Sequence, residues 1–494
     1  MFDDLKRLFR HGSVYLLGNI LNRIGAFLLL PLYTTYLSVS EYGVLEMLYS
    51  TVAIISVVFA AGMSHTTLRF YFEFEDQRDR NAVITTNLAM IFAFSVLGAL
   101  AVHTARFGLS EFLFDTTSYA SAVDLCLIIM VLELSTEVGF AYLRAKEQSQ
   151  FYVMLSLSRL LLQVSLSIYF VSGLRMGVQG VLLANLASVA LGWLVVTGYT
   201  LFRCGVSIHL AKIPVMLRYS VPVAMTAIVG TVTFNSDRFL VKEMMSLEAV
   251  GLYGLALKFA LLLTFLVAEP FYRAYGPFRF SIIHQDNARA IQALVVHYLL
   301  VGAIFVGLGI SLFTPEVLQL VSSAAYVSAY HYTPILLLGV IVSAMSYCFE
   351  TGILYKKKTK YIFYISSVDF VVKIGLNLAL IPFLGLYGAA ITYLVTNLCH
   401  ATLINRVSQR LYPVTYYYLD MAKIVSIGVV IYLLSLGMGQ QHLYMSILVK
   451  LALIGIYVLA VYLVDQKTRD VFSKAGSYLK LSRLGTGKGN ESQS

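Results

Sequence analysis

Ionisable residues inside long apolar stretches are the first candidates for chemistry in this chain of 494 residues. A charge held near the middle of a lipid bilayer costs several kcal/mol, so such residues usually pair, carry protons or bind a charged ligand. Four bases and three acids lie well inside apolar stretches: Arg23, Arg159, Lys258, Lys373, Glu133, Glu137 and Asp369. We therefore treat these seven residues as the candidate site.

The stretch that contains Arg23 is unusually polar. Asn19 lies one helical turn before Arg23 on the same predicted face, and Pro31 follows two turns later, where it can kink the helix. A polar, kinked helix is typical of a moving helix that lines a cavity. Arg23 is expected either to face a ligand there, together with Asn19, or to form a buried ion pair with an acid such as Glu133.

Glu133 and Glu137 are spaced i,i+4 and share one predicted helix face. Two carboxylates this close repel each other unless one is protonated or a base lies between them. Two interpretations follow. The pair could carry a coupling proton, or it could neutralise Arg23 or Arg159.

Asp369 and Lys373 have the same i,i+4 spacing but opposite charges, so they can neutralise each other on one helix. Lys373 is then either paired or left for a substrate. Lys258 has no acid nearby in the sequence and is a stronger candidate for a substrate contact. The excess of deep bases favours an anionic ligand, and phosphate or pyrophosphate is a group that Arg and Lys hold well.

Other charged residues lie at the ends of the apolar stretches. Asp237 and Arg238 are expected to anchor a hairpin, a structural role. Glu269 and Arg273 close another stretch and could act as a gate. Lys450 lies near the end of a stretch, where a lysine can extend its ammonium to the membrane interface.

The elements that carry these residues are predicted to be transmembrane helices. The composition is 59% hydrophobic and 13% charged, whereas soluble domains carry about 25% charged residues. Apolar runs of about 20 residues match a hydrocarbon core of roughly 30 Å, and helices satisfy the backbone in lipid. We predict an all-α integral membrane protein with about fourteen spans, at residues 13–37, 42–66, 82–105, 119–143, 151–172, 178–202, 219–241, 249–271, 291–313, 332–355, 361–384, 387–407, 421–438 and 444–464.

The first span follows a basic start, as a signal peptide would. Its length, its polar residues and the lack of a small-residue cleavage pattern favour a retained helix. The cysteines are scattered without metal-ligand or disulfide spacing, so we interpret them as apolar packing residues, and we expect no metal and no cofactor. They are Cys126, Cys204, Cys348 and Cys399.

The distribution of the net charge of +10 predicts the orientation. Basic residues gather in the two termini and in every second loop, and on the other side only Arg106, Arg175, Arg238 and Lys242 occur. This asymmetry places both termini in the cytoplasm and argues against nucleic acid as a partner. The run at 356–360, with four lysines, is interpreted as an anchor to anionic lipids. The tail after 485 is expected to be disordered.

An internal repeat divides the spans. Ser38 and Ser246, Gly43 and Gly251, and Gly177 and Gly385 are each 208 positions apart, and every pair lies between or beside corresponding spans. An even number of helices per unit makes the repeats parallel, a common plan of transporters with the substrate site between the repeats. We predict a six-helix lobe at 1–206, a second at 207–410, two extra helices at 411–465 and a tail at 466–494.

The chain resembles bacterial polysaccharide flippases of the Wzx type. Residues 13–19 and 37–43 resemble the start of these proteins, and residues 237–241 and 248–253 resemble the opening of their second half. The resemblance implies the multidrug/oligosaccharidyl-lipid/polysaccharide exporter superfamily, with two lobes forming a V around a cationic cavity. The arginine in the first helix of related lipid II flippases corresponds to Arg23, although the match does not extend to a neighbouring acid.

The resemblance also implies a function. The expected substrate is a polyprenyl-pyrophosphate-linked oligosaccharide such as an O-antigen unit, moved by alternating access to the outer leaflet of the bacterial inner membrane. Membrane lipids, a polysaccharide polymerase and chain-length proteins are expected partners, and H⁺ or Na⁺ is a possible coupling ion.

Two other functions stay open at this point. A cation-coupled drug or metabolite exporter of the same superfamily would be expected to line its cavity with acids and aromatic residues. A membrane-embedded polymerase or glycosyltransferase would usually place catalytic residues in long outer loops. The outer loops here are short and nearly free of charge, and no acid pair suits glycosyl transfer, so we do not expect an enzyme.

Overall fold

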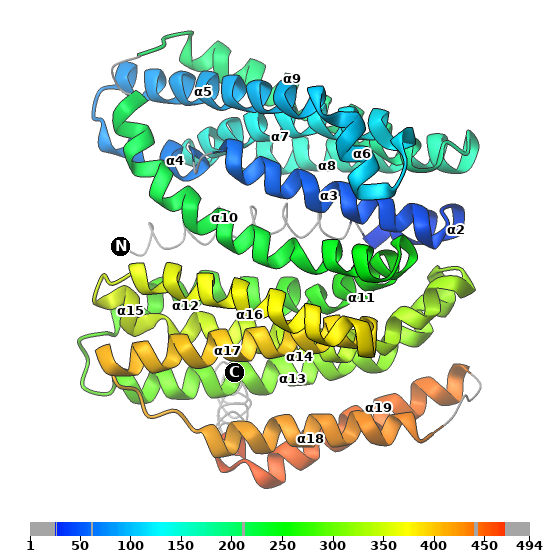
Figure 1. Ribbon diagram of the computed structural model, residues 1–494. Helices are drawn as coiled ribbons and strands as arrows, with labels where there is room; N and C mark the ends of the chain where they lie inside the picture. Colours follow the sequence, from blue (N-terminus) through cyan, green and yellow to red (C-terminus); the bar gives the residue numbers. More distant parts are fainter. Residues whose placement is uncertain (1–24, 26, 61–62, 210–212, 439–442, 470–494) are drawn as a thin grey trace, which may run out of the picture. The chain divides into compact units, whose positions relative to one another are not determined.

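The computed structural model describes residues 25–469 except 26, 61–62, 210–212 and 439–442, and these residues form helices without any strand (Figure 1). Ten of the helices in this part are long and apolar enough to cross a membrane. The predicted all-α membrane fold is thereby confirmed. Residues 1–24, with Asn19 and Arg23, lie outside the described residues, as does the end of the tail from 470.

Each predicted span from the second to the fourteenth coincides with a helix. The first span is described only from its later part, where helix α2 (Leu30–Tyr36) begins with Pro31 in its first turn. Proline is well tolerated at this point because the first N–H groups of a helix have no partner inside it. Gly25, Phe27 and Leu28 are also helical and Leu29 is a turn, so the helix is interrupted next to Pro31, where a kink was predicted.

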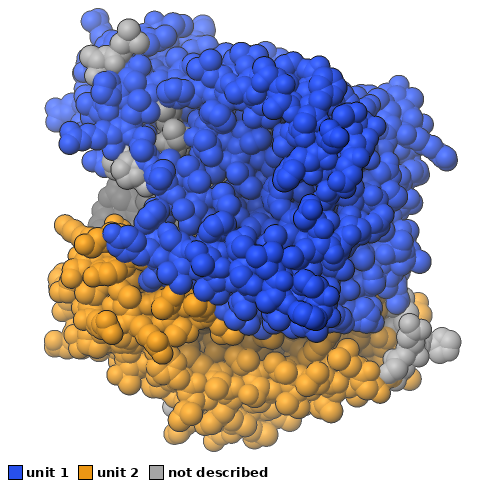
Figure 2. Space-filling view, in the orientation of Figure 1, with its two compact units in different colours: residues 1–256, 318–332, 362–396 blue, residues 257–317, 333–361, 397–494 orange. Residues whose placement is uncertain are grey.

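The described chain forms two compact units, which Figure 2 shows in different colours. Unit 1 comprises residues 1–256, 318–332 and 362–396, and unit 2 comprises residues 257–317, 333–361 and 397–494. These units divide the chain at other places than the predicted lobes at 1–206 and 207–410, which follow from the repeat. The lobes stay a prediction.

Unit 1 is built mainly from the first half of the chain. Most of its elements are α-helices, and they are accompanied by a π-helical segment, η2, and two 3₁₀ turns, η1 and η5. They are α2, α3 (Val39–Ala60), α4 (Met63–Glu73), α5 (Gln77–Thr104), α6 (Arg106–Phe114), η1 (Thr117–Tyr119), α7 (Ala120–Ala145), α8 (Ser149–Ser167), η2 (Ile168–Gly173), α9 (Gly177–Cys204), α10 (Ile213–Met244), the start of α11 (Leu247–Leu263), η5 (Ala324–His331), most of α16 (Lys360–Leu384) and the start of α17 (Leu386–Leu411).

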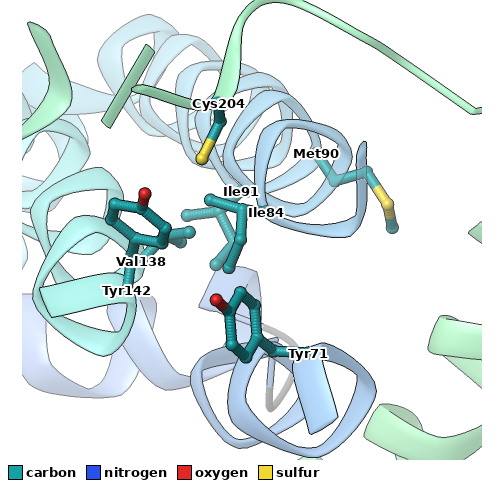
Figure 3. Packing of buried hydrophobic residues seen from close by; sticks show 7 residues of the cluster. All are labelled: Tyr71, Ile84, Met90, Ile91, Val138, Tyr142 and Cys204. Atoms are coloured by element: carbon teal, nitrogen blue, oxygen red, sulfur yellow. The ribbon is translucent and has the colours of Figure 1, made fainter. Parts of the chain in front are cut away.

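A core of buried side chains holds α4, α5, α7 and α9 together. Figure 3 shows Tyr71, Ile84, Val138 and Cys204 pointing toward one another from these four helices. Removal of such apolar surface from water stabilises the fold by about 25 cal/mol per Å². Cys204 is part of this packing, as predicted for the cysteines, and Cys126 and Cys348 are buried as well, while Cys399 is partly buried.

Short-range polar contacts define the helix starts at the repeated positions. Before α3, the Ser38 backbone N–H and hydroxyl donate to the Glu41 carboxylate (2.8 and 2.9 Å), and the Glu41 N–H donates to the Ser38 hydroxyl, a capping box. Before α11, the Ala249 N–H donates to the hydroxyl of Ser246 (3.2 Å). Gly177 and Gly385 share a left-handed backbone with φ of 54° and 57°. These two pairs of positions have similar local structure.

Unit 2 contains the remaining helices, which are labelled in Figure 1. They are the end of α11, η4 (Thr264–Ala268), α12 (Glu269–Ser281), α13 (Ala288–Val321), α14 (Thr333–Phe349), α15 (Thr351–Tyr355), the end of α17, α18 (Tyr418–Leu436) and α19 (Leu443–Val464). The last two form a hairpin beside α13, where the Tyr457 hydroxyl donates to the Val301 carbonyl (3.1 Å).

Candidate functional site

A buried ion pair in unit 1 joins α10 to α16. The Lys373 ammonium lies 2.7 Å from the Asp237 carboxylate, and the two side chains are 3% and 0% exposed. Asn377, one turn after Lys373, donates from Nδ2 to Asp237 Oδ1 (2.7 Å), and the Tyr253 hydroxyl donates to Oδ2 (2.8 Å). Asp237 thus accepts three hydrogen bonds, which satisfies a carboxylate that water cannot reach.

A second ion pair lies next to the first in the sequence. The Arg238 Nε lies 3.4 Å from Glu46 Oε2 on α3, and both side chains are buried. Arg238 also lies over the Phe234 ring, and its Nη1 donates to Asn235 Oδ1 (3.5 Å). The two pairs contain two acids and two bases, so the buried network carries no net charge. We call Glu46, Asp237, Arg238, Tyr253, Lys373 and Asn377 the unit 1 network.

The hairpins at the repeated positions meet beside this network. A Cβ on Gly43 of α3 would lie 1.9 Å from the Leu247 carbonyl oxygen, and a Cβ on Gly251 of α11 would lie 2.4 Å from the Val39 carbonyl oxygen. Glycine is required at both positions because the helix backbones touch. One turn further, Gly254 leaves room for the Glu46 side chain. The Tyr326 hydroxyl donates to the carbonyl of Ser38 (2.9 Å) and so holds the first hairpin from another side.

These contacts change one expectation from the sequence, which concerned the partner of Lys373. Lys373 binds Asp237 of α10, rather than only the Asp369 carboxylate one turn away on its own helix. The pairing alternative holds for Lys373 in this structure, and a contact between Lys373 and a substrate stays a prediction. Asp369 itself is 5% exposed. Asp237 and Arg238 do anchor the hairpin region, and they do so through buried partners on other helices.

Arg159 forms a separate pair in unit 1. Its Nη2 lies 3.4 Å from Glu133 Oε1, and the side chains are 17% and 51% exposed. Gly192 of α9 leaves room for the Arg159 side chain, because a Cβ at Gly192 would lie 2.6 Å from Arg159 Cδ. Of the two interpretations of Glu133, a coupling proton or an ion pair with a deep base, this structure shows the ion pair with Arg159. Glu137, one turn further along α7, is half-buried.

The unit 2 candidates lie on α11 and α12. Lys258 and Glu269 are half-buried, and Arg273 is exposed. Lys450 does not extend to the interface as expected. It pairs with the Glu316 carboxylate of α13, which also accepts a hydrogen bond from the Ser446 hydroxyl (2.6 Å). With this carboxylate within reach, the Lys450 ammonium forms an ion pair instead of extending to water.

Several members of the unit 1 network were missed by sequence reasoning. Glu46, Tyr253 and Asn377 are polar residues within predicted spans, and that position was an available signal for Glu46 and Asn377. His297 in unit 2 was not identified from the sequence either. Its Nε2 lies 2.7 Å from Oδ2 of Asp465, the residue just after α19. Among the described residues, no group of three or more His, Cys, Asp or Glu residues could hold a metal ion.

Comparisons with known proteins come from sequence and from structure. A family model described as "Polysaccharide biosynthesis protein" matches residues 8–284, more than half of the chain. A search of curated protein sequences finds no match.

Solved structures are similar in fold. A structure of the lipid II flippase MurJ in an inward closed conformation matches with a TM-score of 0.75 and 13% identity, covering 93% of this chain and 100% of that chain. An inward-facing multidrug resistance MATE family transporter of the MOP superfamily matches with a TM-score of 0.63 and 15% identity, covering 78% and 94%. A MATE transporter of Vibrio cholerae matches with a TM-score of 0.54 and 17% identity, covering 82% and 97%.

Proposed function

This chain belongs to the polysaccharide biosynthesis protein family, and from that membership we propose that it is a flippase for a lipid-linked glycan. The proposed substrate is a polyprenyl-pyrophosphate-linked oligosaccharide. The protein would move it from the cytoplasmic to the outer leaflet of a bacterial inner membrane, with both termini of the protein in the cytoplasm. The similarity in fold to a lipid II flippase supports this choice.

The contact between the α2–α3 and α10–α11 hairpins is the observation that carries the mechanism. The two hairpins occupy equivalent positions in the predicted repeat, and they touch through backbone at Gly43 and Gly251. Alternating access requires two equivalent halves to separate at one end while they close at the other. We infer that this close contact opens and re-forms during transport, and that the neutral ion pairs beside it favour one defined closed arrangement.

The proposed substrate contacts are three of the deep bases in the predicted spans. We assign this role to Arg23, Arg159 and Lys258. The Arg159 partner, Glu133, is half exposed, and an exposed ion pair contributes only about 0–1 kcal/mol. A pyrophosphate, with more charge than one carboxylate, could therefore displace Glu133 from Arg159. Glu133 and Glu137 are the proposed carriers if the transport is coupled to protons.

Surface display of the polysaccharide in a strain that lacks its own flippase tests the proposal. We expect Arg23→Ala, Arg159→Ala and Lys258→Ala each to reduce display at unchanged protein level, and the exposed Lys423→Ala to have no effect as a control. Loss of one charge-assisted contact of about 1.5–3 kcal/mol should weaken substrate binding about tenfold or more. Full display by all three alanine variants would rule out the cationic cavity.

A further inference from the structure

Three segments of unit 2 meet around two tyrosine rings. The centroid of the Tyr355 ring, at the end of α15, lies 6.1 Å from that of His284 and 5.7 Å from that of Tyr412. The Lys356 ammonium lies 5.0 Å from the centre of the Tyr355 ring, and the Arg289 guanidinium lies 5.1 Å from the centre of the Tyr412 ring. We call these five residues the cation–aromatic cluster.

The charge of this cluster is not compensated by the protein. His284, Arg289 and Lys356 are all exposed. Within the described residues neither Arg289 nor Lys356 lies in an ion pair with a carboxylate, and the exposed Asp286 in the same loop forms no ion pair either. Both cations instead lie over ring faces, which leaves N–H donors toward solvent. Three more lysines follow directly in the chain and are exposed: Lys357, Lys358 and Lys360.

The cluster lies where transmembrane helices begin and end. The candidate spans Ala288–Val321 and Lys360–Leu384 start beside it, and the candidate span Thr333–Tyr355 ends in it. Because span ends lie at the level of the lipid headgroups, the cluster is placed at the membrane interface. Tyrosine rings prefer this level, and basic residues there are attracted to anionic lipids by about 1 kcal/mol each.

We propose that the cation–aromatic cluster binds the phosphodiester headgroup of an anionic phospholipid. Arg289 and Lys356 supply the charge, His284 adds a ring nitrogen, and the Tyr355 and Tyr412 rings provide the apolar wall against which the glycerol part of the lipid packs. The proposal does not depend on the flippase proposal, because none of its five residues is among the proposed substrate contacts. A lipid headgroup and a soluble anion share the phosphate chemistry. The location of the cluster at the membrane interface favours the lipid.

The test uses the purified full-length protein, stripped of lipid in a neutral detergent. The midpoint of thermal unfolding is measured while phosphatidylglycerol, phosphatidylcholine or inorganic pyrophosphate is titrated. A ligand that binds the folded state raises this midpoint. We expect phosphatidylglycerol to raise it for the native protein, and phosphatidylcholine and pyrophosphate to have no comparable effect at the same concentrations.

Substitutions assign the effect to the cluster. The variant R289Q/K356Q is expected to need about tenfold more phosphatidylglycerol for the same shift. The variant R289K/K356R keeps both charges and should respond like the native protein, which separates loss of the site from loss of folding. The matched control is R78Q/R203Q, which removes two exposed arginines of unit 1, one of them also over a tyrosine ring.

Two results would overturn the proposal. One is an equal response of R289Q/K356Q and R78Q/R203Q to phosphatidylglycerol. The other is protection by pyrophosphate that matches or exceeds protection by phosphatidylglycerol, because the site would then take a free phosphate rather than a lipid headgroup. If R289Q/K356Q does not fold, the single variant K356Q at the exposed lysine takes its place, with an expected intermediate shift.

Discussion

Asp237 is the residue on which the buried polar network of unit 1 depends. Its carboxylate accepts hydrogen bonds from the Lys373 ammonium, the Asn377 side-chain amide and the Tyr253 hydroxyl. A buried ion pair gains little over a well-packed apolar pair, but removal of one partner leaves an uncompensated charge. The network therefore responds very differently to single and to paired substitutions.

Replacement of Lys373 with methionine should be strongly destabilising. The substitution keeps a side chain of similar length and removes the ammonium, so the Asp237 carboxylate is left ionised and buried, at a cost of about 3–5 kcal/mol. The measurement is the free energy of unfolding, or the thermal midpoint in detergent, of Lys373→Met against the native protein.

The double variant Asp237→Asn/Lys373→Met is the control for this prediction. Both charges are gone, so most of the stability lost in Lys373→Met should return, and the coupling between the two positions should be large. If the two single losses simply add in the double variant, the two residues do not act as a pair.

Sequence reasoning identified the charged residues at this scale but not all of their partners. A spacing of i,i+4 finds neighbours on one helix, such as Asp369 for Lys373. The carboxylate that binds Lys373 lies on α10, more than a hundred positions earlier, and only packing brings it close. For Glu133 the choice between two possible bases was also left open, and the fold places Arg159 beside it.

At the scale of elements, the hairpins α2–α3 and α10–α11 touch through glycine. The Cβ of any other residue at Gly43 would overlap a backbone carbonyl, which cannot rotate away as a side chain could. The helices would have to move apart, and the hydrogen bond of Tyr326 to Ser38 lies in the same contact.

Gly43→Ala is expected to hold the hairpins apart and to reduce polysaccharide display several-fold in cells with native protein levels. Gly302→Ala on α13 is the matched control, because a Cβ at Gly302 meets no atom within 4 Å. Display is measured for both variants in the same strain. Native display by Gly43→Ala would show that this backbone contact is not needed for transport.

The segment after α19 is fixed by a carboxylate outside the spans. Burial opposes ionisation of Asp465, but hydrogen bonds from Thr468 and His297 outweigh this and hold its pKa below the usual value. A carboxyl group with a lowered pKa in the folded state adds stability above its ordinary pKa, and this stability is lost as pH falls through the lower folded-state pKa.

Asp465→Asn should therefore lower stability at neutral pH, by about 2 kcal/mol for lost hydrogen bonds to a charged group. The difference between the variant and the native protein should shrink as the pH falls from neutral to below about 4, the ordinary range of an aspartate. Thermal midpoints across this pH range measure it. A difference that stays constant with pH would show that the charge of Asp465 is not involved.

The helices themselves were largely predictable. Apolar length alone predicted helical segments at the second to fourteenth predicted spans, because a bilayer requires about 20 apolar residues in each span. The repeat also placed Ser38 and Ser246 between corresponding spans, and each of them directly precedes a helix. The full length of some helices could not be predicted from apolar length. Helices α10 and α13 have 32 and 34 residues and extend beyond their apolar runs, because helix ends also depend on the packing of polar residues.

At the scale of the whole molecule, the chain is a multi-pass membrane protein of the polysaccharide biosynthesis family with the fold of flippases and exporters. Composition was sufficient to predict the membrane, and the distribution of basic residues between alternate loops disfavoured nucleic acid. The glycan could not be predicted, because specificity for sugars depends on the shape of a cavity rather than on residue types in a sequence.

Transport of a lipid-linked glycan is tested most directly with the purified protein in liposomes. A polyprenyl-pyrophosphate-linked oligosaccharide with a fluorescent sugar is placed in both leaflets, and a membrane-impermeant quencher is added outside. We predict that the native protein makes the inner-leaflet pool accessible to the quencher, and that Lys258→Ala does so more slowly. A pool that stays as protected as in protein-free liposomes, with the protein folded and inserted, would contradict the proposed function.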